Sequence, residues 1–389
     1  MLNETTSIDC QLCKNTKVSE LYSRTQYAGG VLGTLEYKIV MCDNCGFAYS
    51  NPRPTEKSIM QHYKSSGSGE VFHENKPNSR HGLLLKERIS FINSFLISKT
   101  KGQFLDIGCG NGELLIKLDL PGWDLVGLEP GNGSDSVKTK SISIINDVIE
   151  NLGNQKQYDA ISLISSLEHV YDPQKVILII SKLLKKGGVL FIEVPDSKKP
   201  IAQIAEFYSF EHLSHFTDYT LEYLLHKNGF KVMKYDKNVS VSNIRCAAVK
   251  INDEFSLTLN DDRNELKQAI NNYILQRKSR IQLISANIVA QIEFIKSSSG
   301  KIAIYGAGVH TNFLLETFDI EQIVSCYIDS DIKKLGTIFR NKIIYGPTEI
   351  PNLEVNAILI SSHDYESEIF ETVKKHNKNK LLVLKCYTK

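Results

Sequence analysis

The segment QFLDIGCGNGELL, residues 103–115, constrains the fold of this chain more than any other feature. Its first residues are apolar and typical of a buried strand, and Gly108, Gly110 and Gly112 then form a turn that leads into a helical pattern. Glycines at such a turn let the backbone approach a ligand closely, next to the N-terminus of the following helix. The segment therefore predicts an α/β domain with a ligand-binding edge at this turn.

Strand and helix patterns alternate between about residues 82 and 235. Apolar, strand-like segments lie at 103–108, 124–130, 142–147, 158–164 and 188–195. Alternation of this kind predicts a parallel sheet covered by helices on both faces. One long helix or two helices are expected within residues 255–297, and a second, smaller α/β pattern begins at residue 298. The Gly/Ser-rich residues 65–80 are expected to form a loop.

Four of the eight cysteines form two pairs with the same spacing, Cys10-x-x-Cys13 and Cys42-x-x-Cys45. In a reducing compartment this spacing favours zinc over disulfides, because two such turns complete a tetrahedral sulfur site. Four sulfur ligands leave no open coordination position, so the zinc ion would be structural. Residues 1–57 hold few long apolar stretches and need such a staple to fold. The alternative is four cysteines without a shared function.

The composition excludes several classes of protein. The formal net charge is +2, so neither nucleic acid nor an anionic membrane is expected as the main partner. No uncharged apolar run approaches the ~20 residues that span a bilayer, and the N-terminus has no signal-peptide pattern. We therefore expect a cytoplasmic enzyme that acts on a small molecule.

Acidic residues near the glycine turn narrow the choice of cofactor. Asp106 lies just before Gly108, Glu129 ends the next strand, and the segment SSLEHVYDP (165–173) follows the fourth strand. A nicotinamide-binding turn would more often read G-x-G-x-x-G, with its third glycine one position later than here. Together these residues resemble class I S-adenosylmethionine-dependent methyltransferases, which have a Rossmann-like fold.

This resemblance implies roles for individual residues. The implied cofactor-binding residues are Asp106, Gly108, Gly110, Gly112, Glu129 and Asp147. Asp106 would lie at the methionine end of S-adenosylmethionine, Glu129 would hold the ribose, and Asp147 would approach the adenine. His169 follows the fourth strand, and the resemblance implies that it lies near the transferred methyl group, at the edge where open α/β sheets bind ligands.

The whole chain resembles a three-part family of zinc-containing sugar C-methyltransferases. In that arrangement a zinc-binding module (1–57 here) precedes the methyltransferase domain (58–238), and a helix with a smaller Rossmann-like substrate-recognition domain (239–389) follows. The C-terminal resemblance rests on Tyr305, Gly306, Ala307, Asp329, Lys334 and Gly336. The family acts on nucleotide-linked 4-keto-6-deoxy sugars, which implies a nucleotide sugar as substrate. The resemblance also implies that Tyr63 faces the cofactor; a packed aromatic is the alternative.

The segment EHLSHF, 211–216, follows the fifth strand. It resembles the family's Y-x-E-H-x-S-Y-F segment, with His215 in place of a tyrosine and Tyr208 one residue away from the expected position. The resemblance implies that His212 removes a proton from the carbon beside the keto group. Glu211 would orient His212 or bind a substrate hydroxyl, and Tyr208 would complete the catalytic group. An imidazole suits the base because it is readily neutral near pH 7.

The same segment has a second, structural interpretation. HLSHFTDYTLEYLL also fits a loop held together by its histidines before an amphipathic helix that Thr217 or Asp218 caps. For His215 this structural role is the favoured one. The expected function is C-methylation of a keto sugar through an enolate, and the first alternative is O- or N-methylation of a sugar or surface glycan. The second alternative is a non-catalytic binding protein of glycan assembly.

Overall fold

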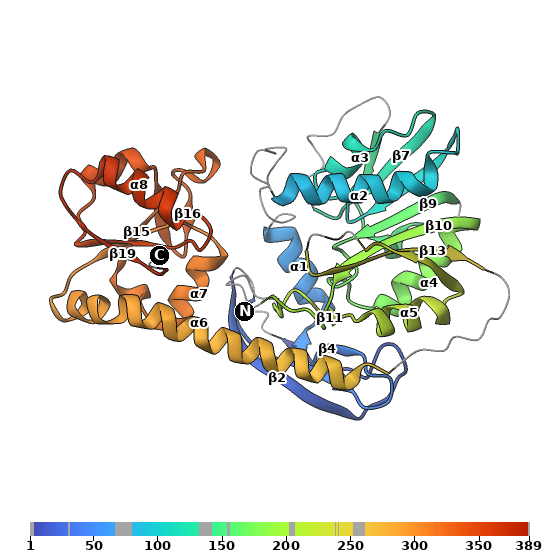
Figure 1. Ribbon diagram of the computed structural model, residues 1–389, viewed down its shortest axis with the longest axis horizontal. Coiled ribbons are helices and arrows are strands. Elements are labelled where there is room, and N and C mark those ends of the chain that lie inside the picture. Colours follow the sequence, from blue (N-terminus) through green and yellow to red (C-terminus); the bar gives the residue numbers. More distant parts are fainter. Residues whose placement is uncertain are drawn as a thin grey trace. The chain divides into compact units, whose positions relative to one another are not determined.

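The structure is a computed structural model that describes residues 4–29, 32–66, 80–131, 142–153, 156–201, 207–237, 239, 241–251 and 261–387 (Figure 1). The chain divides into two compact units. The first unit holds Met1–Pro200 and Tyr208–Ile270, and the second holds Ile201–Phe207 and Asn271–Lys389. Most of the loop expected at 65–80 lies outside the described residues.

The first unit is built around a seven-stranded sheet in the order β12-β13-β10-β9-β6-β7-β8. Its strands are β6 (Gly102–Ile107), β7 (Trp123–Leu128), β8 (Ile142–Ile145), β9 (Tyr158–Ile164), β10 (Leu184–Pro195), β12 (Phe230–Tyr235) and β13 (Asn243–Lys250). Strands β6 to β10 pair in parallel, as predicted, whereas β12 and β13 add an antiparallel edge. The sheet thus extends past residue 238 to Lys250.

Helices cover both faces of this sheet, because successive strand residues point to opposite sides. Leu105 and Ile161 pack on one face with buried residues of α4 (Pro173–Leu183) and α5 (Asp218–Lys227). Their chain neighbours Phe104 and Ala160 pack on the other face with α2 (Arg80–Leu96) and α3 (Glu113–Lys117). Figure 1 shows α2 and α4 on opposite sides of the strands. The predicted α/β layers of this unit are therefore confirmed.

Local signals explain where two of these helices begin. Asp172 accepts a hydrogen bond from the amide of Lys175 at the start of α4, and Pro173 is the first helical residue. Thr217 caps α5 as expected, and Thr220 completes a reciprocal capping pair with it. The helix that follows the EHLSHF segment thus has its predicted start.

The N-terminal segment forms a four-stranded antiparallel sheet within the first unit. Three of its strands are β2 (Val18–Gly29), β3 (Gly33–Cys42) and β4 (Ala48–Ser50), and the fourth is β11 (Ser214–His215). A short pair, β1 (Thr5–Thr6) with β5 (Arg53–Pro54), precedes α1 (Glu56–Ser66). We call residues 4–54 the cysteine module. No local sequence pattern predicts that β11 joins this sheet.

The second unit is a smaller α/β domain, and the helix α6 (Arg263–Ser297) leads into it. Its sheet has the order β16-β17-β15-β14-β18-β19, with β14 (Ile302–Tyr305), β15 (Val324–Ile328), β16 (Ile338–Phe339), β17 (Lys342–Tyr345), β18 (Ala357–Ile360) and β19 (Leu382–Lys385). Ile284, Ile288 and Ile292 of α6 are buried with α7 (Val309–Phe318) on one face. Val373 of α8 (Glu366–His376) packs on the other.

Three of the C-terminal residues singled out by resemblance, Ala307, Asp329 and Lys334, contact one another. Asp329 Oδ2 accepts hydrogen bonds from the Ala307 amide and from Lys334 Nζ, each at 3.0 Å. Gly306 has φ 114°, a conformation that favours glycine, and a side chain there would meet the Ser361 carbonyl. These residues hold the turn that follows β14.

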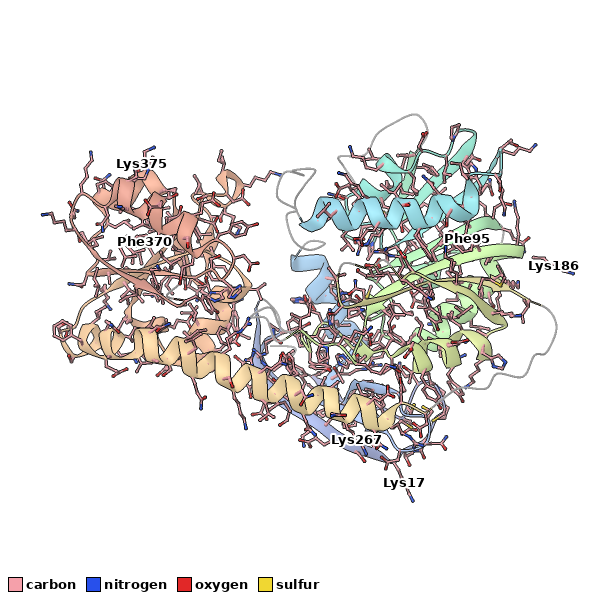
Figure 2. All side chains as sticks on the ribbon, in the orientation of Figure 1. Lys17, Phe95, Lys186, Lys267, Phe370 and Lys375 are labelled. Atoms are coloured by element: carbon pink, nitrogen blue, oxygen red, sulfur yellow. The ribbon has the colours of Figure 1, made fainter. Side chains whose placement is uncertain are left out.

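Lysine side chains are exposed in separate parts of the chain. Lys17, Lys186 and Lys375, for example, are exposed and extend outward from their own parts of the chain (Figure 2). None of the described helices is long and apolar enough to cross a membrane.

Candidate active site

The glycine turn after β6 has the backbone geometry that the sequence predicts. Gly108, Gly110 and Gly112 have φ values of 72°, 52° and 74°, in the left-handed region that favours glycine. A Cβ at Gly108 would overlap the side chain of Ser166, whereas a Cβ at Gly110 would meet no atom of the described residues within 4 Å. The turn therefore leaves open space beside Gly110, where a bound molecule can approach the backbone.

Two buried carboxyl groups flank this turn. Asp106 Oδ1 accepts a hydrogen bond from Ser162 Oγ at 2.6 Å, and burial raises the pKa of Asp106 to about 7. Glu129, at the end of β7, accepts from the amides of Gly110 and Gly131 at 3.0 and 3.1 Å. Glu129 is thus fixed against the turn itself. Both acids lie at the carboxyl edge of the sheet, where open α/β sheets bind ligands.

Asp147 lies farther along the same edge, after β8. Its Oδ1 accepts from the Val148 amide at 2.8 Å and from Asn151 Nδ2 at 2.7 Å. These contacts stabilise the short 3₁₀ turn Ile149–Asn151 and fix the position of the carboxylate.

The structure brings together four of the predicted catalytic and cofactor-facing residues. The His169 and His212 rings have centroids 4.9 Å apart in an edge-to-face arrangement. His169 Nδ1 lies 3.1 Å from the backbone oxygen of Glu211 and 3.4 Å from the Tyr63 hydroxyl. Burial raises the pKa of Tyr63, so its hydroxyl stays protonated and can donate a hydrogen bond.

The carboxylate of Glu211 has a partner that was not predicted from the sequence. His62 Nε2 lies 3.3 Å from Glu211 Oε1, and the His62 ring packs edge-on against Phe210. Burial acts to raise the pKa of Glu211, but His62 and the neighbouring histidines hold it below its usual value. Glu211 is therefore an ionised carboxylate beside His169 and His212. The signal in the sequence was the QHYKSS segment, in which His62 directly precedes Tyr63.

Tyr208 does not join this cluster. Its side chain is fully buried, its hydroxyl donates to the Ser197 carbonyl at 3.1 Å, and its ring packs against His215. A hydroxyl that is already bonded inside the core is not available to a substrate, which corrects the catalytic placement expected for Tyr208. His215 is also buried, and desolvation lowers its pKa well below the usual value. Both residues hold the loop in place.

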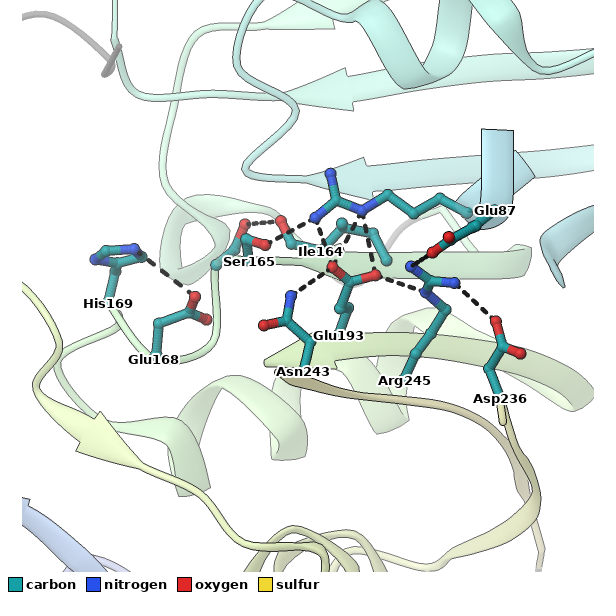
Figure 3. Close-up of polar contacts among 11 residues, drawn as sticks. Glu87, Ile164, Ser165, Glu168, His169, Glu193, Asp236, Asn243 and Arg245 are labelled. Carbon is teal, nitrogen blue, oxygen red and sulfur yellow. Dashed lines mark hydrogen bonds and ion pairs between the residues drawn. The ribbon is translucent and has the colours of Figure 1, made fainter. Parts of the chain in front are cut away.

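A buried ionic network supports the same edge and was likewise not predicted (Figure 3). Glu193 of β10 is fully buried between Arg88 and Arg245, at 2.5 and 2.6 Å. Arg245 also pairs with Asp236, and Asn243 donates to Glu193. Burial acts to raise the pKa of Glu193, but the two arginines hold it below its usual value. The network joins α2 to the end of β10.

Two groups of the described residues have the geometry of a metal site. One is the cysteine set, in which Cys10 Sγ and Cys45 Sγ are 3.5 Å apart and Cys13 Sγ and Cys42 Sγ are 3.4 Å apart. A tetrahedral zinc ion with zinc–sulfur bonds of about 2.3 Å would hold its sulfurs about 3.8 Å apart, so the four cysteines fit it. The other is Glu168, His169 and His212, whose nearest ligand atoms lie within 4.8 Å of one another.

Comparisons with known proteins match two parts of this chain. A family model for methyltransferase domains matches residues 81–235, and a model described as C2185-like, N-terminal, matches residues 298–382. The ubiquinone biosynthesis O-methyltransferase of Vibrio atlanticus is 34% identical over 111 residues, which cover 25% of this chain and 47% of that protein. The corresponding enzyme of Proteus mirabilis is 31% identical over 106 residues, covering 25% and 43%. The chain thus spans about half the length of the curated relatives it matches.

Solved structures with a similar fold include an S-adenosylmethionine-dependent methyltransferase from Clostridium acetobutylicum. It has a TM-score of 0.38 and 15% identity, and the match covers 45% of this chain and 96% of that one. The N-methyltransferase NodS from Bradyrhizobium japonicum has a TM-score of 0.35 and 14% identity, covering 44% and 98%.

The family match defines the class of the central domain: residues 81–235 form a methyltransferase domain.

Proposed function

We propose that this enzyme methylates a carbon atom next to the keto group of a nucleotide-linked 4-keto-6-deoxy sugar. The observation that carries the proposal is the approach of His212 to His169, whose Nδ1 contacts the Glu211 backbone oxygen, at the carboxyl edge of the sheet. A carbon next to a ketone becomes a nucleophile only after it loses a proton, so the reaction requires a base at this position. His212 is the proposed base.

The residues around His212 are suited to stabilise an enolate intermediate. When the base takes the proton, negative charge develops on the keto oxygen, and a hydrogen-bond donor must face it. The protonated hydroxyl of Tyr63 is the proposed donor, because it lies beside His169 in the same cluster. Glu211, held by His62, is proposed to bind a substrate hydroxyl or to orient the His212 ring. His169 is proposed to line the path to the methyl donor.

Cofactor binding is assigned to the glycine turn and its flanking acids. S-adenosylmethionine supplies an electrophilic methyl group when bound. We infer that Asp106 and Gly108 hold its methionine end, Glu129 its ribose hydroxyls and Asp147 its adenine side, with Gly110 and Gly112 shaping the turn. The open space beside Gly110 supports this placement.

Two further assignments belong to the same proposal. The four cysteines are proposed to bind one structural zinc ion, so that residues 1–57 are a zinc-binding module. The C-terminal part from residue 239 is proposed to recognise the nucleotide sugar.

O-methylation is the second candidate function. The names of the matched curated relatives favour it, since they are O-methyltransferases. The same His212 would then deprotonate a hydroxyl, and no enolate would form. N-methylation would need a substrate amine at the same place. The non-catalytic alternative has no support, because the glycine turn and Glu129 are intact.

A proton-exchange experiment distinguishes C-methylation from O- and N-methylation. A panel of keto sugar nucleotides is incubated with the enzyme in deuterated water without methyl donor, and the carbon next to the ketone is followed by NMR. Enolate formation predicts exchange that requires His212. Absence of exchange, together with transfer of label from S-adenosylmethionine to a hydroxyl or amine, would contradict C-methylation.

A further inference from the structure

The loop that carries His212 is built into the sheet of the cysteine module. Strand β11 pairs antiparallel with β4, with Ser214 opposite Tyr49 and His215 opposite Ala48. The Ser50 amide donates to the Leu213 carbonyl at 3.1 Å. Since β11 begins two residues after His212, this pairing fixes the backbone immediately beside the proposed base.

Side chains of the module hold the rest of the same loop. Ser50 Oγ donates to the backbone oxygen of His212 at 3.1 Å. The Tyr37 hydroxyl donates to the Tyr208 carbonyl at 2.6 Å, and Gln26 Oε1 accepts from the Phe210 amide at 3.2 Å. These contacts come from three different strands of the module and spread over the whole loop from 208 to 215.

The module also holds the loop that carries His169. The Tyr171 carbonyl accepts from Arg53 Nη2 at 2.6 Å and from Gln11 Nε2 at 2.5 Å. Arg53 is fully buried, and its guanidinium lies 4.1 Å from the centre of the Tyr171 ring. Gln11 lies between Cys10 and Cys13, so one contact to this loop comes from within a Cys-x-x-Cys turn.

The cysteine cluster lies where these contacts originate. Cys42 ends β3, and the turn to Cys45 leads directly into β4, the strand that pairs with β11. A metal ion that joins this turn to Cys10 and Cys13 would fix β4 and Gln11 relative to each other. The hydrogen bonds of Asp106 and Glu129 run instead to Ser162, Gly110 and Gly131, all within the central domain.

We propose that the cysteine module is the positioning element of the active site: through strand β4 and Ser50 it places His212, and through Arg53 and Gln11 it places the His169 loop. Closure of the four-cysteine site then controls methyl transfer without controlling cofactor binding. Ser50 is a positioning residue that acts through the backbone of His212. The inference rests on the proposed function in naming His212 as the base and the four cysteines as a zinc site.

The test compares Ser50→Ala with Ser23→Ala in the full chain. Ser23 is the matched control, because it lies on β2 of the same module and its side chain is exposed. Loss of the Ser50 hydroxyl is expected to lower turnover by about tenfold, the equivalent of one buried hydrogen bond, with S-adenosylmethionine affinity unchanged. Amide hydrogen exchange of residues 211–215, followed by mass spectrometry, is expected to accelerate. Ser23→Ala should change neither quantity.

Removal of the metal ion is the second part of the test. Treatment of the native enzyme with a zinc chelator is expected to accelerate exchange in residues 211–215 and to abolish turnover, while calorimetric affinity for S-adenosylmethionine stays within about threefold. Unchanged exchange of this loop after the metal is lost, or a parallel loss of cofactor affinity, would overturn the inference. The exchange result does not depend on which atom is methylated, so a failure of C-methylation and a failure of this inference are distinguishable.

Discussion

His169 Nδ1 lies 3.1 Å from the backbone oxygen of Glu211, which joins the loop after β9 to the loop after β10. A backbone oxygen can only accept, so Nδ1 donates the hydrogen of this contact. The other ring nitrogen, Nε2, lies 3.9 Å from Glu168 Oε1. The loops that carry His169 and His212 are thus joined by a hydrogen bond from a side chain to the main chain.

Replacement of His212 tests the proposed base. His212→Ala is expected to lower methyl transfer by on the order of a thousandfold, because a positioned general base contributes about that much. Affinity for S-adenosylmethionine, measured by calorimetry, should be unchanged. His226→Ala in the last turn of α5 is the control and should keep full activity. Equal loss of activity in both variants would argue for a general folding defect instead.

The pKa of Asp106 predicts how cofactor binding depends on pH. Because burial raises this pKa to about 7, the carboxyl is mostly protonated at pH 6 and mostly ionised at pH 8. The ionised form attracts the cationic cofactor, so affinity should rise by roughly tenfold between these values. The Asp106→Asn variant should bind S-adenosylmethionine weakly, and its affinity should not rise between pH 6 and pH 8.

The raised pKa of Asp106 also makes the stability of the cofactor-free enzyme depend on pH. Here the effect is opposite: the stability falls as the pH rises. Between about pH 4 and pH 7 the folded state keeps the Asp106 proton that the unfolded state has lost, so this group lowers the free energy of unfolding as the pH rises. Denaturant titrations of the wild type and Asp106→Asn across this range should differ in slope. If the free energies of unfolding of the two proteins change in parallel with pH, Asp106 is ionised over this whole pH range.

Loss of Arg245 should destabilise the central domain. Arg245→Met leaves the buried Glu193 with fewer partners, and we expect the free energy of unfolding to fall by about 3 kcal/mol in urea titrations. The partly exposed pair of Lys185 with Asp159 is the control, and Lys185→Met should cost less than about 1 kcal/mol. Because the pKa of Glu193 is lowered, its contribution is present above the unfolded-state pKa and is lost as the pH falls.

Metal analysis distinguishes the two candidate metal groups. We expect one zinc ion per chain, lost in Cys42→Ser, because among the residues that the structure describes only the cysteine set offers four ligands. A second metal ion that is lost in Glu168→Gln would show that Glu168, His169 and His212 bind a metal ion as well. An ion bound there would occupy the lone pair that His212 needs to act as the base. Wild-type protein without zinc would contradict the structural role of the cysteines.

Local features of this fold were predictable from the sequence, whereas distant pairings were not. The glycine turn at Gly108 and the start of α5 at Thr217 follow from residue types and spacing within a few positions. The pairing of β11 with β4 joins residues 214–215 to residues 48–49, and no local pattern encodes such a register. The contact of His62 with Glu211 is equally remote in sequence. Tyr208 was misplaced because a shift of one residue turns a side chain from the site into the core.

The most direct test of the central claim is the position of the new methyl group. The enzyme is incubated with S-adenosylmethionine labelled with ¹³C in its methyl group and with nucleotide-linked 4-keto-6-deoxy sugars, and the product is examined by ¹³C NMR. We predict a methyl resonance coupled to a ring carbon next to the ketone, and no such product from His212→Ala. A methyl group bonded to oxygen or nitrogen would contradict the account.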